Sequence, residues 1–224
     1  MNLHMDFTRP IIIQSADEPW ADTPLAGVQR RRLERNGGEI TTRATSIVKY
    51  ASGSSFTEHS HPGGEEYLVL EGTFSDATGH APKGSYVRNP PGSRHAPFNE
   101  QGCQIFVKLE QFHPEDNEFV TIDTHTTPWT VDASSGHNEM RLHATHTETV
   151  KLLAFTQSSA VTEAHLSGGV ELLVLQGEIH LETEALARQN YPRHTWIRLP
   201  PGHRFTLTGP LETQLYIKHG HLLP

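Results

Sequence analysis

The sequence contains very little cysteine, few basic residues and no long hydrophobic run. A single cysteine, Cys103, among 224 residues excludes an internal disulfide framework and a multi-cysteine zinc module. The formal net charge of −8, with histidine neutral, argues against a nucleic-acid partner. The apolar run at residues 11–13 is too short for a signal peptide, and no stretch is long enough to span a membrane. We therefore expect a cytoplasmic protein with no membrane partner.

Glycine and proline are frequent instead, with 18 and 15 copies. They separate short segments rich in β-branched and aromatic residues, of which four in the N-terminal half are expected to be strands: residues 46–51, 66–71, 85–88 and 104–110. This pattern predicts an all-β fold of many short strands.

Three of the 16 histidines lie in motifs that suit a metal site. His59 and His61 are one residue apart, so they point to the same face of an extended strand. The turn at residues 62–64 returns Glu65 beside them, and His95 follows a second turn, Pro-Pro-Gly. Neutral imidazoles with one carboxylate bind zinc, iron, manganese or nickel. We predict one divalent metal per chain, held by His59, His61, Glu65 and His95.

Two neighbouring carboxylates compete for the fourth ligand position. Strand alternation sends Glu65 and Glu66 to opposite faces. Glu66 recurs as Glu171 in the second half of the chain, where the other ligands do not recur, so we expect Glu66 to be a structural or rim carboxylate. The alternative for Glu65 is to accept a hydrogen bond from a ligand histidine instead of binding the metal. The alternative for His59, His61 and His95 is an ordinary surface or hydrogen-bonded role.

The spacing of these motifs matches the two cupin signatures. Residues 53–72 read Gly, five residues, His-x-His, three residues, Glu, six residues, Gly. Residues 84–99 read Gly, five residues, Pro-x-Gly, two residues, His, three residues, Asn. Together with the surrounding residues 43–45 and 86–97, they closely resemble the ChrR-like cupin family. That family is named for a zinc-containing anti-sigma factor and includes stand-alone dioxygenase-like members.

The second half of the chain repeats the first. Residues 162–177 align without gaps on residues 57–72, and residues 196–205 align on residues 86–95. In this overlay each ligand position is apolar: Ala164, Leu166, Val170 and Phe205. We therefore predict a bicupin, two tandem antiparallel jelly-roll barrels, whose second barrel binds no metal.

The overlay also predicts the domain boundaries. We expect an irregular leader at residues 1–18, a metal-binding cupin at 19–112, a linker at 113–128 and a degenerate cupin at 129–224. Residues 184–189 are expected to form an inserted loop or short helix, and His219 to His221 a flexible tail. Four residues are candidates to line the metal cavity: Tyr67, Tyr86, Arg88 and Phe98.

The resemblance implies a zinc-binding bicupin similar to the sensor half of the ChrR anti-sigma factor, with a regulatory or stress-sensing role. Zinc held by all four residues would have a filled coordination shell, which suits such a role. The sigma-binding module of that factor carries a His-x3-Cys-x2-Cys stretch, which this sequence lacks. A sigma-factor partner is therefore not supported.

The alternative that the resemblance implies is a metal-dependent dioxygenase acting on a small diketone-like or aromatic ketone substrate. Iron or manganese in the same residues would keep open positions for a small-molecule ligand. Glu65 would then be an optional ligand or a proton acceptor. The sequence assigns no catalytic residue, and it leaves both a monomer and a homodimer open.

Overall fold

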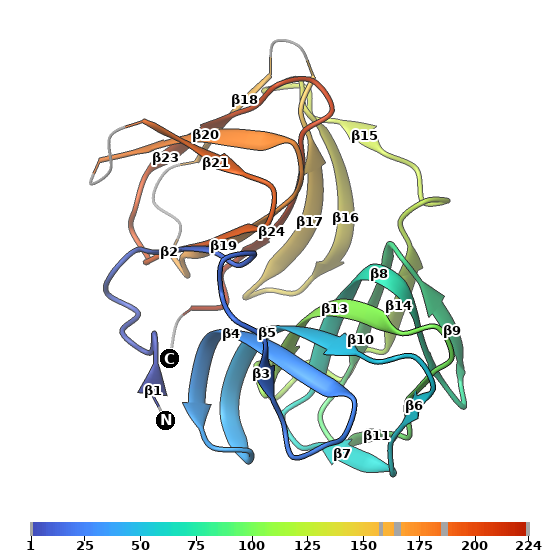
Figure 1. Ribbon diagram of the computed structural model, residues 1–224. Coiled ribbons are helices and arrows are strands. Elements are labelled where there is room, and N and C mark those ends of the chain that lie inside the picture. The colour runs from blue at the N-terminus through green and yellow to red at the C-terminus, as the bar shows by residue number, and fades with distance from the viewer. Residues whose placement is uncertain (1, 157–158, 164–166, 185–187, 223–224) are drawn as a thin grey trace. The chain divides into compact units, whose positions relative to one another are not determined.

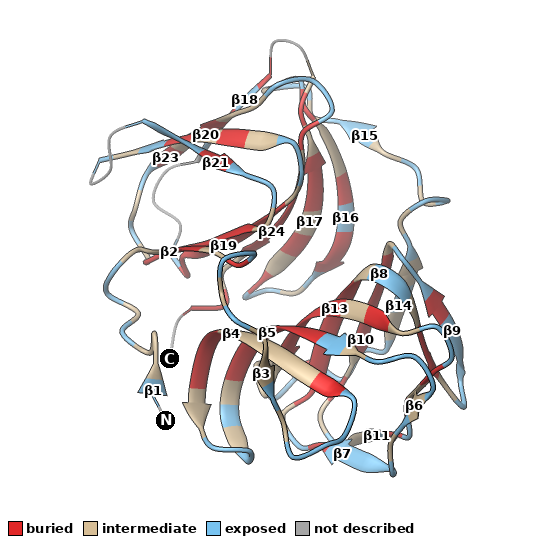
Figure 2. Cartoon of the chain, viewed as in Figure 1, coloured by how far each residue is buried: buried red, intermediate tan, exposed pale blue. Residues whose placement is uncertain are grey.

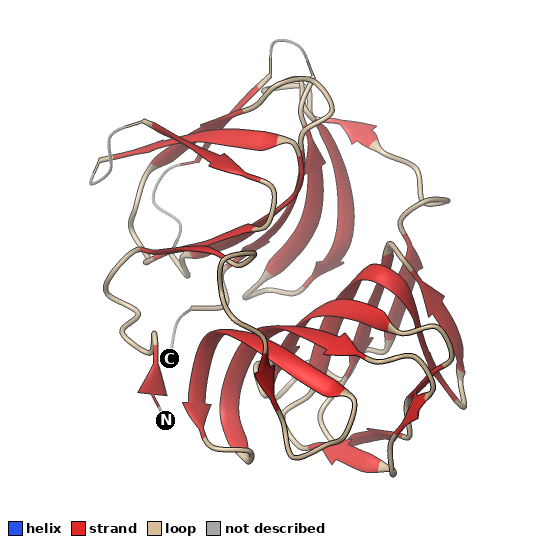
Figure 3. Cartoon of the chain, in the orientation of Figure 1, coloured by secondary structure: helices blue, strands red, loops and turns tan. Residues whose placement is uncertain are grey.

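The described part of the chain consists of strands and the loops between them, as Figure 3 shows. The computed structural model describes residues 2–156, 159–163, 167–184 and 188–222. None of these residues lies in an α-helix, which confirms the all-β prediction. Over the same residues, no helix is long and apolar enough to cross a membrane. The chain divides into two compact units, Met1–Met5 with Asp17–Thr127, and Asp6–Ala16 with Pro128–Pro224.

The first unit is an antiparallel barrel built around one large sheet (Figure 1). Its strands are β1 (Asn2–Leu3), β3 (Ala21–Asp22), β4 (Val28–Gly37), β5 (Thr41–Tyr50), β6 (Ser54–Ser55), β7 (His59–His61), β8 (Glu65–Asp76), β9 (Gly79–Pro82), β10 (Ser85–Asn89), β11 (Ser93–His95), β12 (Phe98–Asn99), β13 (Cys103–Leu109) and β14 (Val120–Asp123). The main path of the sheet is β1-β4-β5-β13-β8-β10-β14, and β7 and β11 form a separate two-stranded sheet.

The second unit repeats this plan with two sheets. Its strands are β2 (Ile11–Gln14), β15 (Thr130–Val131), β16 (Asn138–Ala144), β17 (Thr149–Ala154), β18 (Ala160–Glu163), β19 (Val170–Gln176), β20 (Glu178–Thr183), β21 (Gln189–Pro192), β22 (Thr195–Leu199), β23 (Phe205–Thr208) and β24 (Gln214–His219). One sheet has the order β15-β16-β17-β24-β19-β22-β2, and the other has the order β18-β23-β20-β21. The bicupin prediction is therefore confirmed.

Each barrel takes an edge strand from a segment predicted to lie outside both barrels. In the first unit, β14 comes from the expected linker and pairs with β10. In the second, β2 comes from the expected leader and pairs with β22. The three consecutive isoleucines of β2 are β-branched, which favours a strand, and Ile13 is buried beside Trp196. Contrary to the prediction of an irregular leader at residues 1–18, residues 2–3 and 11–14 form strands.

Each barrel has its own apolar core, visible in Figure 2 as buried residues along the central strands. The first core contains Tyr67, Val69, Phe74 and Ile105, among others. The second contains Leu172, Leu199, Phe205 and further aliphatic residues. Several polar residues are also buried in the first unit, among them His61, Glu65 and His95 of the predicted metal site.

The C-terminal segment is more ordered than expected. His219 belongs to β24, and His221 is buried and hydrogen-bonded to Glu171 at 2.8 Å. This buried contact contradicts the flexible tail. Of the inserted segment at 184–189, residues 185–187 lie outside the described residues, and Gln189 begins β21.

Candidate metal centre

Three histidines are brought together by a short pair of strands. β7 and β11 are antiparallel, and His95 lies opposite His59 while Ser93 lies opposite His61. Because side chains alternate along each strand, the three imidazoles share one face of this pair. Every pair of their ring centroids is 4.9 Å apart. The structure therefore places His59, His61 and His95 in one cluster, as the motif spacing predicts.

The turn after His61 brings Glu65 back to the cluster. The carbonyl oxygen of His61 accepts hydrogen bonds from the backbone amides of Gly64 at 3.1 Å and Gly92 at 2.8 Å, so it joins the two signature turns. Gly64 has a φ of +84°, and a Cβ there would lie 2.5 Å from the Phe112 ring. Only glycine fits this conformation and this space.

The donor atoms of these residues are close enough to share one ion. The Nε2 atoms of His61 and His95 are 3.0 Å apart, and Oε2 of Glu65 is 3.6 Å from each of them. One ligand atom from each of the three histidines lies within 4.8 Å of the others. Ligand atoms about 2.1 Å from one ion are separated by about 3.0 to 3.4 Å at octahedral or tetrahedral angles.

Hydrogen bonds on the far side of the cluster orient its members. Asp76 accepts a hydrogen bond from Nδ1 of His95 at 3.2 Å, and the carbonyl of Thr57 lies 3.2 Å from Nδ1 of His59. Asn89 donates to Oε2 of Glu65 at 3.1 Å. With Nδ1 engaged, His59 and His95 each present Nε2 to the site, an arrangement typical of metal-binding histidines.

The electrostatics of the site favour neutral imidazoles. Burial, followed by the positive charge that His59 can carry, lowers the pKa of His61 to about 4. Burial also lowers the pKa of His95, although the charge of Glu65 opposes this. Burial raises the pKa of Glu65. Since metal ions bind the unprotonated ring, His61 and His95 are in the ligating form at neutral pH.

The residues present therefore fit a divalent metal. Three imidazoles and a buried carboxylate converge, His59 is exposed while the other three are buried, and orienting partners are in place. The donor set suits zinc, iron or manganese equally, so it fixes no single metal.

A pocket of about 310 Å³ opens beside the cluster in the same barrel. Its polar lining residues are His95, Asp76, Thr78, His80, Asn89, Ser93, Arg94 and Thr121. Its wall of larger apolar residues consists of the aromatic Tyr67, Phe74 and Phe119 and the aliphatic Val87. Phe119 is 70% exposed at this pocket, whereas Phe74 is 1% exposed. A small molecule in this pocket can reach His95 and lie against aromatic rings.

Only one of the four expected cavity residues lines this pocket. Tyr67 does, because it shares the face of Glu65 on β8. Arg88 lies opposite Glu66 in the ladder, on the other face, and donates a hydrogen bond to it at 2.7 Å. Tyr86 shares that face with Arg88, and Phe98 is not among the lining residues. Tyr86, Arg88 and Phe98 thus do not line this pocket, and Glu66 forms a buried ion pair with Arg88.

Two residues of the site were missed in the sequence. Asp76 ends β8 and reaches His95 only because β8 and β11 come together in the barrel, so no motif spacing marks it. Asn89 lies opposite Glu65 in the β8–β10 ladder and directly precedes Pro90. A strand pairing inferred between 65–68 and 86–89 would have indicated Asn89.

In the second barrel, apolar residues occupy the positions that correspond to the predicted metal ligands. Glu65 is paired with Asn89 and Leu109, and Val170 is paired in the same way with Leu199 and His219. Val170 therefore occupies the position of Glu65. Val170, Leu199 and Phe205 are all at most 1% exposed and belong to the apolar core. The other two replacements, Ala164 and Leu166, lie outside the described residues, as does His165.

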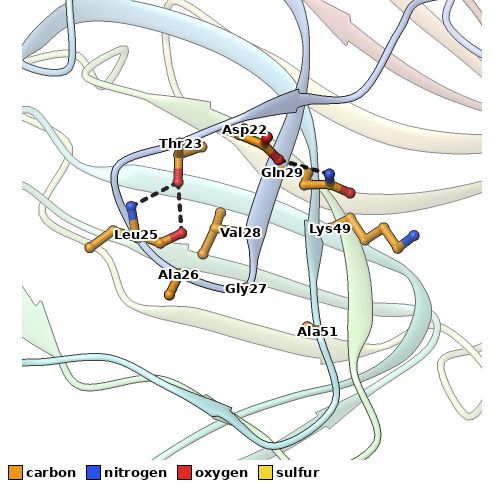
Figure 4. Close-up of a pocket in the computed structure, with 9 residues that line it drawn as sticks. All are labelled: Asp22, Thr23, Leu25, Ala26, Gly27, Val28, Gln29, Lys49 and Ala51. Atoms are coloured by element: carbon orange, nitrogen blue, oxygen red, sulfur yellow. Dashed lines mark hydrogen bonds between the residues drawn. The ribbon is translucent and has the colours of Figure 1, made fainter.

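Another hollow in the first unit has a different character. It measures about 400 Å³ and lies at the loop between β3 and β4 (Figure 4). Asp22 and Lys49 are its ionisable lining residues, and Asp22 accepts a hydrogen bond from Gln29 at 2.9 Å. Its remaining lining is mostly small or aliphatic, and it holds none of the histidine clusters, so it is not the candidate site.

Comparison with known proteins finds a family model that matches part of the chain. Residues 8–113 match the family model described as the ChrR cupin-like domain. Comparison with curated proteins finds no significant match.

Several solved structures share the fold across both barrels. Protein Ylba from E. coli has a TM-score of 0.76 and 15% identity, with coverage of 96% of this chain and 92% of that chain. The oxalate decarboxylase formate complex of Lactobacillus farciminis has a TM-score of 0.69 and 10% identity, with coverage of 95% and 86%. A point mutant of the salicylate 1,2-dioxygenase from Pseudoaminobacter salicylatoxidans has a TM-score of 0.65 and 12% identity, with coverage of 80% and 71%. At these identities the likeness concerns the fold alone. The protein is thus a bicupin in which residues 8–113 match the ChrR cupin-like domain.

Proposed function

We propose that the first barrel is the catalytic barrel of a metal-dependent oxygenase that acts on a small carbonyl-bearing substrate. The observation that carries this proposal is the pocket of about 310 Å³, which shares His95 with the histidine cluster. A purely structural metal site has no need of an adjoining hollow with an aromatic wall. The sequence alone could not distinguish a sensor from an enzyme, and this pocket favours the enzyme.

The residues of the cluster have distinct roles in this proposal. His59, His61 and His95 would hold the metal, with Glu65 as a fourth ligand or a proton acceptor. A bound iron or manganese ion would supply redox chemistry and open coordination positions. Asp76 and Asn89 hold His95 and Glu65 in orientation through their hydrogen bonds.

Glu65 is suited to move a proton. Its pKa is raised by burial, so its carboxylate binds a proton more readily than an exposed glutamate does. It lies 3.6 Å from the imidazoles of both His61 and His95. A substrate with an acidic C–H or O–H beside His95 could therefore lose its proton to Glu65.

Pocket shape and related folds support a small organic substrate. Phe74, Val87 and Phe119 provide apolar contact, and hydroxyl and guanidinium groups lie beside them. Among the proteins that share the fold, one is a salicylate dioxygenase and another an oxalate decarboxylase. The ketone-type substrates implied by the ChrR-like resemblance have a comparable size.

The test is a measurement of dioxygen consumption by protein purified anaerobically and loaded with Fe(II), Mn(II) or Zn(II). Diketones, aryl ketones and aromatic carboxylates are offered in turn. Turnover with Fe(II) or Mn(II), and its loss in a His61→Ala variant, is the expected result. If no tested compound stimulates uptake with either metal, while Zn(II) is held tightly at one per chain, the oxygenase proposal fails.

A second candidate function is a zinc-dependent regulatory role. The observation in its favour is that four donors converge, which can complete the shell of a zinc ion without an exogenous ligand. In either case we propose a cytoplasmic protein, monomeric or dimeric, whose partner is a small molecule. The sequence supports no sigma-factor, nucleic-acid or membrane partner.

A further inference from the structure

Tyr67 is a buried tyrosine with an unused hydroxyl. Its side chain lines the pocket beside the metal cluster, and the residue is only 4% exposed. Over the described residues, no hydrogen bond involves this hydroxyl, and the oxygen is not among the fully buried unsatisfied atoms. Buried tyrosine hydroxyls usually have a partner. A free hydroxyl with access to a pocket is therefore available to a ligand.

The position of Tyr67 places this hydroxyl near the metal cluster. Tyr67 and Glu65 are two residues apart on β8, so their side chains enter the barrel from the same face, about 7 Å apart along the strand. The ring of Tyr67 packs against Phe74, with centroids 5.0 Å apart, which restricts its orientation. A molecule of a few atoms that contacts His95 can reach the hydroxyl.

The second barrel provides an internal comparison for this position. Tyr67 is paired with Val87 and Val107, and Leu172 is paired equivalently with Ile197 and Ile217. Leu172 is fully buried in the apolar core. The barrel therefore packs well with leucine here, and the hydroxyl is not needed for folding.

The same replacement occurs at both orienting residues. Asp76 corresponds to Leu181 by the pairing of β8 with β9 and of β20 with β21, and Asn89 corresponds to Leu199. Both leucines are fully buried. In the barrel without metal ligands, Tyr67, Asp76 and Asn89 are thus all replaced by leucine. Asp76 and Asn89 have functions tied to the cluster, so their loss with it is expected. The parallel loss of the tyrosine indicates that its hydroxyl also serves the site.

The remaining pocket residues define what the hydroxyl would bind. Ser93 contributes a second hydroxyl oxygen without a hydrogen-bond partner, and Arg94 contributes a guanidinium group. The opposite lining is apolar, with Phe74 and Phe119. A pocket with hydrogen-bond donors on one side and aromatic rings on the other suits a compact apolar molecule that carries an acceptor oxygen.

We infer that the Tyr67 hydroxyl donates a hydrogen bond to the carbonyl or carboxylate oxygen of the substrate and so fixes its orientation beside His95. This inference rests on the proposed function, because it assigns a role within the same pocket. It makes Tyr67 a substrate-binding residue and leaves metal binding to the histidines and Glu65.

The test is calorimetric titration of the metal-loaded protein with two probes, 2,4-pentanedione and benzoate. The two probes distinguish a ketone oxygen from a carboxylate. Tyr67→Phe should bind the matching probe about fivefold to tenfold more weakly, as expected for one lost neutral hydrogen bond. The control is Tyr50→Phe, since Tyr50 packs against the same Phe74 ring at 5.4 Å but does not line the pocket. The Tyr50→Phe variant should bind each probe with the affinity of the unaltered protein.

The outcomes separate this inference from the function on which it rests. Metal content and melting temperature of Tyr67→Phe should match those of the unaltered protein, because phenylalanine keeps the packing. If the unaltered protein binds a probe and Tyr67→Phe binds it equally well, the role of Tyr67 is refuted while the proposed function stands. If the metal-loaded protein binds neither probe, the inference and the proposed small-molecule pocket are both refuted.

Discussion

Replacing Asp76 by asparagine should weaken metal binding without removing any metal ligand. The Asp76 carboxylate lies 3.2 Å from Nδ1 of His95, and its side chain is only 12% exposed. Although burial alone would raise its pKa, hydrogen bonds from Thr78 and the contact with His95 lower the pKa of Asp76, so it is charged at neutral pH. A charged acceptor fixes the tautomer of His95 and increases the basicity of its Nε2.

Asparagine keeps the size of this side chain but loses the charge. Loss of such an orienting carboxylate typically costs about 10-fold to 100-fold in metal affinity, or about 1.4 to 2.7 kcal/mol. The assay is competition for Zn(II) against a chromophoric chelator at fixed pH. A matched control is Asp6→Asn. Asp6 accepts hydrogen bonds from the backbone and hydroxyl of Thr8, just as Asp76 does from Thr78, but it lies in the second unit.

The control separates loss of the turn from loss of the orienting charge. Asp6→Asn should leave metal affinity unchanged. If Asp76→Asn also binds Zn(II) as tightly as the unaltered protein, then Asp76 does not orient a metal ligand through His95.

Three further predictions concern ligands, stability and pH. A His59→Ala, His61→Ala double variant should lose its stoichiometric metal in elemental analysis; retention of one equivalent would refute the site. Arg88→Ala should destabilise the first unit by about 3 to 5 kcal/mol in urea unfolding, because it removes a buried guanidinium that contacts the buried carboxylates of both Glu66 and Asp116. Arg94→Ala, at a side chain 69% exposed, should change stability by less than about 0.5 kcal/mol, and equal effects would contradict this reasoning. Burial, followed by the charge of Lys151, lowers the pKa of His219 to about 4. As the pH falls, the imidazole is therefore protonated near pH 6.5 in the unfolded chain but only near pH 4 in the folded chain. The free energy of unfolding should thus be highest above pH 6.5 and fall by on the order of 3 kcal/mol toward pH 4. In denaturant titrations at several pH values, the free energy of unfolding of a His219→Leu variant should depend less on pH.

The metal cluster was the most predictable part of the molecule. His59 and His61 share a face through simple alternation, and a glycine turn returns Glu65 to them, so local spacing determines three of the four positions. His95 required the resemblance to the cupin signatures, because its approach depends on the pairing of β7 with β11.

The features that failed to follow from sequence depend on contacts between distant segments. β2 is a strand only because β22 offers an open edge, and Ile11 to Ile13 carried the β-branched signal that could have indicated it. Arg88 does not line the pocket beside His95, because its ladder partner, Glu66, lies on the face opposite to Glu65. Asp76 reaches His95 through the closure of the barrel, which no spacing along the chain reveals.

The most direct test of the account is to locate the metal by anomalous X-ray diffraction from crystals of metal-loaded protein. We predict one strong peak in the first barrel, within bonding distance of His59, His61 and His95 and beside Glu65, and none at Val170 in the second. The absence of a peak among these histidines, or an equal peak in the second barrel, would contradict it.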